Sequence, residues 1–169
     1  MIVRLKKSAD GRTALTCIRA DGTSTWQRQN DALARFFPRH DLTHFAVETV
    51  LRIDSGFYGL VSRGWDLSDF GTPWPRGPLP PEANISERIV GFFDRDRSTG
   101  QMGDAEELNA DLAEFARESG VGAPAFTDSD LTAVRQARGE LFARWDAVEP
   151  GGALELRFES ELPVQTQRG

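Results

Sequence analysis

The chain has 169 residues, of which 39% are hydrophobic and 27% are charged, and its net charge is −6 with a pI near 5.0. This composition is typical of a soluble globular protein, and a chain of this length can bury a core without disulfide bonds. The acidic balance argues against nucleic acid as a partner, because binding phosphates requires a basic surface. No segment approaches the run of about 20 apolar residues that a membrane span requires, so we expect no membrane partner.

The N-terminal segment predicts a β-meander. Apolar and polar residues alternate in "IVRLKK" (2–7) and "TALTCIRA" (13–20), and "TSTWQRQ" (23–29) follows. Both connections contain Asp-Gly, a strong hairpin signal. Cys17, the only cysteine in the sequence, lies in the second strand. A lone cysteine forms no intrachain disulfide, so we expect Cys17 to be a core residue and the protein to be cytoplasmic.

The middle of the chain predicts helices, because its apolar residues recur at helical spacing. The predicted helices span residues 40–54, 81–97, 104–120 and 127–148. Asp104 is the expected N-cap of the third, and Gly120 is its expected C-terminal stop. Thr127 and Asp130 have the spacing of a capping box at the start of the fourth.

Two segments between these helices are less regular. "SGFYGLVSRGWDLSDF" (55–70) is compatible with a short helix followed by a turn. "GTPWPRGPLPP" (71–81) holds too much Pro and Gly for either regular element. We interpret it as a packed surface strap or as a lid that borders a site.

The C-terminal segment "GALELRFES" predicts one more strand. Its apolar residues Leu154, Leu156 and Phe158 alternate with charged ones, as in a strand with one wet face. We expect these three side chains to share a core with Val3, Leu5, Leu15 and Cys17. The sequence therefore predicts a single α+β domain over residues 1–169, in which an antiparallel sheet of about four strands packs against four or five helices.

The segment "RHDLTHFAVE" (39–48) contains both histidines of the chain. On a helical wheel with His40 at 0°, His44 falls at about 40°, Glu48 at about 80° and Asp41 at about 100°. Apolar residues flank this group on both sides, so the helix is expected to be buried on two sides. Imidazoles one turn apart aim at one point, a spacing that metal-binding helices use. The segment thus predicts a divalent metal, with zinc as the first candidate, and Fe²⁺, Mn²⁺ and Ni²⁺ also suit these donors.

The third ligand is the open question of this site. Glu48 is the nearest carboxylate and completes the predicted set His40, His44 and Glu48. However, His40 and Glu48 lie about 12 Å apart along one helix axis, so a carboxylate from another element is a serious rival. The rivals are Asp54, Glu82 and Glu87, followed by Asp66 and Asp69. Asp41 is the predicted catalytic residue, as a general base or as a group that orients a histidine.

The words "HDLTH" resemble several metal-site motifs over about five residues. Against the zincin motif HExxH, Asp41 replaces the glutamate. The segment also resembles the HDxxH helix of the zinc-binding ubiquinone-biosynthesis proteins. In that family a glutamate follows at a longer spacing, where this chain has Gly56. More broadly, "FFPRHDLTHFAVE" and "GFYGLV…GW" resemble a set of uncharacterised bacterial proteins of similar length, a resemblance that implies no function.

Two functions are compatible with these features. The first is a metal-binding protein that acts as a metal-dependent hydrolase or lyase of a small-molecule ligand. The second is a non-catalytic binding or assembly module, and a homodimer would fit it, in which His40 and His44 are structural core residues. If a metal binds, affinity should fall as pH drops through about 6, because imidazoles bind metal only when neutral.

Overall fold

The computed structural model describes residues 1–29, 33–71 and 75–159 of the chain. Strands at both chain ends enclose a helical middle, in the order expected for an α+β domain. The strands are β1 (Ile2–Lys7), β2 (Thr13–Ile18), β3 (Ser24–Gln29) and β4 (Ala153–Arg157). The helices are α1 (Leu33–Val50), α2 (Phe57–Ser62), α3 (Pro81–Thr99), α4 (Ala105–Ser119) and α5 (Asp128–Asp146), with a 3₁₀ turn η1 at Leu67–Phe70.

The strands form one antiparallel sheet in the order β3-β2-β1-β4. The last strand, β4, pairs with the first strand, β1, so the sheet contains segments from both the start and the end of the described chain. Val3 lies between Cys17 and Leu156, and Leu5 lies between Leu15 and Leu154. These residues and Phe158 are all buried in the core. The predicted common core of the meander and the last strand is confirmed, because period-two alternation sets which face each side chain occupies.

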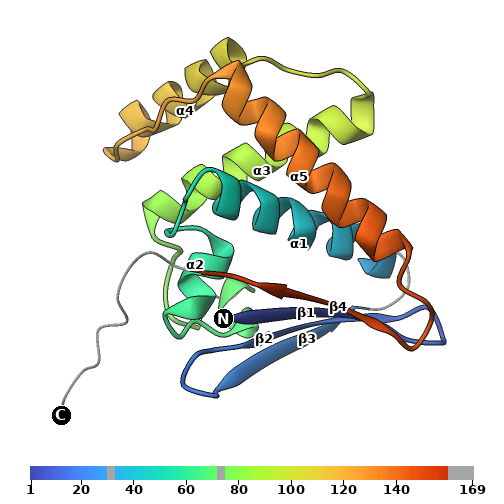
Figure 1. Cartoon of the computed structure of the whole chain (residues 1–169). Coiled ribbons are helices and arrows are strands. Elements are labelled where there is room, and N and C mark those ends of the chain that lie inside the picture. The colour runs from blue at the N-terminus through green and yellow to red at the C-terminus, as the bar shows by residue number, and fades with distance from the viewer. Residues whose placement is uncertain (30–32, 72–74, 160–169) are drawn as a thin grey trace.

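The helices cover one face of the sheet (Figure 1). Helix α1 lies next to the sheet, α3 and α5 lie beyond it, and α4 is the most distant from the sheet. Helix α1 contacts both the sheet and the helices above it, and every residue from 41 to 48 is buried. The prediction of an α+β fold, and of a histidine helix buried on two sides, is thus confirmed.

The boundaries of α1 differ from the predicted range of 40–54. The helix begins at Leu33 and includes Pro38, and it ends at Val50. Pro38 is the sixth residue of the helix, past the first turn, so it removes one backbone hydrogen bond, and the burial of residues 41–48 offsets that cost. At the other end, Arg52 adopts a left-handed φ of 54°, and the Ile53 amide donates to the Glu48 carbonyl at 2.9 Å. This closure ends the helix before Asp54.

The remaining helices follow their capping signals. The Asp104 carboxylate accepts the Glu107 amide, and Gly120 closes α4 in the left-handed conformation. Thr127 and Asp130 form the predicted capping box of α5. The 55–70 segment contains α2 and η1, and part of the predicted strap, residues 72–74, lies outside the described residues.

Two further features bear on the predictions from composition. Cys17 is fully buried, and burial raises the pKa of its thiol to about 12, so it is a protonated core residue. Among the residues that the structure describes, no helix combines the length and hydropathy needed to cross a membrane.

Candidate metal centre

His40 and His44 lie one turn apart on α1, and their rings meet edge to face with centroids 4.8 Å apart. The His44 side chain is 3% exposed, whereas the His40 side chain is 24% exposed. The pair therefore lies at the edge of the core, with one imidazole inside and one reaching solvent. A buried imidazole needs partners for both ring nitrogens, and the facing helix α3 provides carboxylates for both histidines.

Glu87 on α3 faces the two histidines. One ligand atom from each of His40, His44 and Glu87 lies within 4.8 Å of the other two. The His44 Nε2 to Glu87 Oε2 distance is 3.5 Å, close to the edge of about 3.3 Å that donors 2.0–2.1 Å from zinc form in a tetrahedron. The other donor separations are within 4.8 Å, at most about 1.5 Å wider than that edge.

A second carboxylate holds the other nitrogen of each histidine. His40 Nδ1 lies 2.8 Å from Asp94 Oδ2, and His44 Nδ1 lies 3.3 Å from Glu48 Oε1. A carboxylate can only accept, so each pairing favours a proton on Nδ1 and leaves Nε2 as the donor for an ion. Metal-bound histidines commonly have such a carboxylate behind them, where it fixes the tautomer and ring orientation.

The two helices bring this arrangement together through matching periods. Glu87 and Asp94 are seven residues apart on α3, so they lie on the same helix face. His44 pairs with Glu87 and His40 pairs with Asp94, which shows that α1 and α3 cross in opposite directions at this point. Asp94 was not among the predicted site residues, although its i, i+7 spacing from Glu87 indicates that both lie on one helix face.

Glu48 is held in place by the segment that follows α1. Its carboxylate accepts the backbone amides of Tyr58 at 3.3 Å and Gly59 at 3.0 Å, in addition to His44. Glycine is required here by close approach, because a Cβ at Gly56 would lie 2.5 Å from Glu48 Cδ and a Cβ at Gly59 would lie 1.9 Å from the Asp54 carbonyl oxygen. Glu48, predicted as a ligand, thus lies behind His44, outside the group formed by His40, His44 and Glu87.

Asp41, the predicted catalytic residue, is buried in the interior of the domain. Burial raises its pKa to about 6, while the charges of His40 and His44 and a hydrogen bond from Gln29 on β3 oppose the rise. The Gln29 contact places this carboxylate toward the sheet. Its Oδ2 atom has no hydrogen-bond partner among the described residues. A role for Asp41 as a general base stays a prediction.

The charges around the histidines are strongly coupled. Burial lowers the pKa of His44, but hydrogen bonds to Glu48 and Glu87 outweigh it and raise the pKa to about 10. Burial raises the pKa of Glu87, and the hydrogen bond and charge of His44 overcome it, so the net change is downward. The pKa of Asp94 is lowered for the same reason by His40. Burial outweighs the hydrogen bonds to Glu48 and raises its pKa. Without an ion, therefore, the charged partner of protonated His44 at neutral pH is most clearly Glu87.

Aromatic side chains surround the solvent-facing edge of the histidine pair. Phe36 stacks on His40 with centroids 5.4 Å apart, and Phe37 meets the same ring edge to face. Phe57 at the start of α2 contacts His44 at 5.3 Å. These rings cover part of both imidazoles with apolar surface, which reduces the screening of nearby charges by water.

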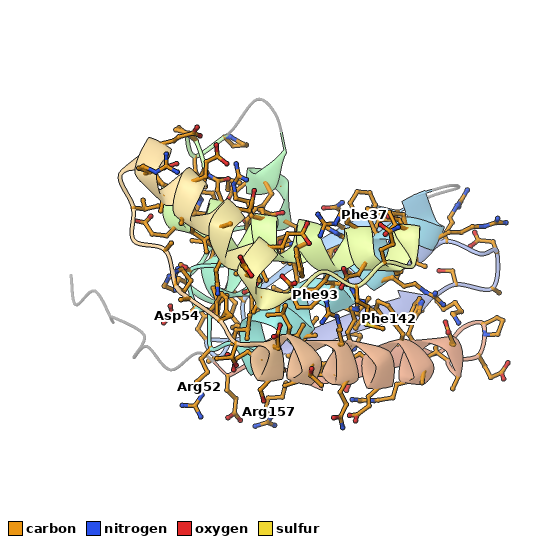
Figure 2. The ribbon with its side chains drawn as sticks, turned by 90° about the horizontal axis from the view of Figure 1, so that it is seen from above. Phe37, Arg52, Asp54, Phe93, Phe142 and Arg157 are labelled. Carbon is orange, nitrogen blue, oxygen red and sulfur yellow. The ribbon has the colours of Figure 1, made fainter. Side chains whose placement is uncertain are left out.

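Glu48 also lines a cavity of about 340 Å³. Its lining includes Arg52, Asp54 and Arg157, which Figure 2 shows together at one end of the domain, but neither histidine. The prediction that the 71–81 strap borders a histidine cavity depends partly on residues outside the described ranges. Within the described part, Arg76 of the strap instead pairs with Asp69.

The other carboxylates considered as ligands lie in separate surroundings. Asp66 pairs with Arg19 at 2.8 Å, and Asp69 pairs with Arg76 at 2.7 Å. Glu82 is exposed on the first turn of α3. Of the rivals to Glu48 that the sequence suggested, Glu87 is the one that the described structure groups with the histidines.

Comparison of the chain with protein-family models, with curated proteins and with solved structures gave no significant match. Any functional assignment therefore depends on the residues of this site.

Proposed function

We propose that the protein binds one divalent metal ion through His40, His44 and Glu87 and uses it as a hydrolase or lyase of a small molecule. The observation that carries this proposal is the convergence of three donor atoms within 4.8 Å, with a further carboxylate behind each imidazole. Three carboxylates, from Glu48, Glu87 and Asp94, contact the two rings.

The donor set favours a catalytic rather than a purely structural ion. Two imidazoles and one carboxylate leave a position for water or substrate, as in zinc hydrolases, and the same donors also suit Fe²⁺. When bound, the ion would lower the pKa of a coordinated water and polarise a substrate oxygen. His40 and Glu87 are 24% and 40% exposed, so the open position would face solvent on their side.

The residues of the chain would divide the work in this proposal. Asp94 and Glu48 keep the two rings oriented, and the amides of Tyr58 and Gly59 keep Glu48 in place. Phe36 packs against the His40 ring and Phe57 against the His44 ring. Glu87 replaces the predicted Glu48 as the third ligand, because a facing helix can bring a carboxylate to a point that a third turn of α1 cannot reach.

A structural role is the second candidate, and one observation favours it. In the metal-free protein His44 is a satisfied cation, with Glu48 on one nitrogen and Glu87 on the other. Such a buried ion pair can persist with no ligand at all, as in an assembly module with core histidines.

Metal analysis of protein purified without a histidine tag separates these candidates. We expect about one equivalent of zinc or iron per chain, lost in the His40→Ala, His44→Ala double variant. Metal-loaded protein should hydrolyse p-nitrophenyl acetate or p-nitrophenyl phosphate faster than the double variant. The structural role would be supported if the protein bound neither Zn²⁺ nor Fe²⁺ on titration at pH 7.5 and its metal-free form still unfolded in a single cooperative thermal transition.

A further inference from the structure

The face of the sheet opposite the helices carries a second candidate site, independent of the metal centre. Figure 1 shows the helices on one side of the sheet only, so the alternate residues of each strand point away from the core. The strand registers arrange these residues in three rows across the sheet. The rows are Ser24-Ile18-Ile2-Arg157, Trp26-Thr16-Arg4-Glu155 and Arg28-Ala14-Lys6-Ala153. We call these twelve residues the open face.

The open face is basic, although the chain is acidic. Four of its residues are cationic and one, Glu155, is anionic, which gives a local net charge of 4 − 1 = +3. The whole chain has a net charge of −6, so the other residues together carry −6 − 3 = −9. Arg4 is partly neutralised by Glu155 at 2.5 Å. Lys6, Arg28 and Arg157 extend the positive charge to both edges of the sheet.

Apolar side chains lie between these charges. Trp26 is 63% exposed and Ile2 is 37% exposed, and both are among the most exposed large hydrophobic residues of the described chain. Ile18, next to Ile2, is half-buried. The Arg28 guanidinium carbon lies 5.9 Å from the centroid of the Trp26 ring, within range of a cation–π interaction. An apolar centre with exposed Trp and surrounding Arg is the usual composition of a protein–protein hot spot.

We propose that the open face binds an acidic segment of a partner protein, with apolar residues against Trp26 and Ile2 and carboxylates against Lys6 and Arg28. A second copy of the same face does not fit, because two surfaces of +3 would repel each other. Nucleic acid is disfavoured by the charge of −9 on the rest of the chain, which a long polyanion would encounter. A short acidic segment stays within the local field, because screening limits these interactions to about 8–10 Å.

The dimensions of the face set the strength of this interaction. Four strands spaced by about 4.8 Å and six residues at about 3.3 Å each give an area of about 19 by 20 Å. This is the size of a small, transient interface, so binding is weak and sensitive to salt.

The test uses the full chain and a synthetic peptide, Glu-Leu-Asp-Glu-Ile-Glu-Asp-Leu, followed by amide chemical shifts in nuclear magnetic resonance spectra. Saturable shifts should appear in β1–β4 and weaken at higher salt. The Lys6→Glu, Arg28→Glu double variant should lower the affinity at least tenfold. Arg117→Glu, an exposed change of the same kind on α4, should leave it unaltered. Melting curves establish that both variants are folded.

Three comparison probes make the outcome decisive. A peptide with Lys in place of each acidic residue should not bind. An eight-nucleotide oligo-dT that binds the open face more tightly than the acidic peptide would overturn the proposal in favour of nucleic acid. Tighter binding to phosphatidylserine vesicles would overturn it in favour of a membrane surface. Shifts confined to other regions, or no shifts with any probe, would also overturn it.

Discussion

Helix α3 carries two aspartates, two residues apart, whose surroundings differ in an instructive way. Asp96 faces α5, where its Oδ2 atom accepts from Arg135 Nε at 3.0 Å and Nη2 at 2.7 Å, and its Oδ1 atom accepts the Gly103 amide. Asp94 faces α1, where it holds His40. Both carboxylates are removed from bulk water, and both have a nitrogen partner.

The difference lies in what the partner can release. A guanidinium remains protonated at all accessible pH values, so the Asp96–Arg135 pair can only be structural. An imidazole can exchange its proton for a metal ion, so the same kind of contact at Asp94 can be part of a binding site. Asp94 and Asp96 therefore differ in the chemistry of their cationic partners more than in their burial.

The largest expected effect concerns the structural pair. Asp96→Ala leaves Arg135 near the core without its carboxylate, and removing one partner of a buried pair costs about 3–5 kcal/mol. Urea denaturation should show this loss, while zinc binding stays unchanged. A variant as stable as the parent protein would mean that solvent screens this pair.

The next largest effect should appear at the metal centre, where zinc affinity should change more than stability. Glu87→Gln removes a ligand but keeps the shape of the side chain, so zinc affinity should fall by roughly a hundredfold or more, since outer partners alone are worth about 10–100-fold. Stability without metal should fall by less than in Asp96→Ala, because Glu48 still pairs with protonated His44. Glu82→Gln on the same helix is the matched control. If Glu48→Gln lowered zinc affinity while Glu87→Gln did not, Glu48 would be the third ligand, as the sequence predicted.

A smaller change is expected for the carboxylate behind His40. Asp94→Asn keeps one acceptor oxygen but loses the charge that makes the imidazole a better ligand, so zinc affinity should fall by about 10–100-fold. Isothermal titration calorimetry at fixed pH measures this. An equal loss of stability in the metal-free protein, with no change in affinity, would place Asp94 in the same structural class as Asp96.

The smallest expected effect is the pH dependence of the stability of the metal-free protein. His44 has a pKa raised from 6.5 to about 10 in the folded, metal-free protein. Its protonation therefore stabilises the fold fully below pH about 6.5, and this contribution is lost as pH rises toward 10, by at most about 1.4 kcal/mol per pH unit. Urea midpoints from pH 6.5 to 10 should fall in the parent protein and less in His44→Gln.

Metal binding should reverse that trend, because zinc needs neutral His44. Zinc affinity should rise with pH across the range from 6.5 to about 10, a wider window than the drop through pH 6 expected for ordinary imidazoles. Stability that is independent of pH in the metal-free parent protein would show that Glu48 and Glu87 do not hold a charged His44.

Local sequence patterns predicted the parts of the fold that depend on neighbouring residues. Alternation placed Val3, Leu5 and Leu156 on the inner face of the sheet, and capping residues marked the starts of α4 and α5, because both signals act over a few residues. The i, i+4 spacing also brought His40 and His44 to one point, since helix geometry alone sets that distance.

The carboxylates that contact those histidines depend on helix packing in the folded domain. Glu87 and Asp94 lie more than forty residues from the histidines along the chain, and their contacts depend on how α1 and α3 cross. Gly56, which leaves room for Glu48 behind His44, is likewise explained by close packing between segments. Local periodicity predicts the direction of a side chain on its own helix, but the packing of helices in the core decides what lies opposite it.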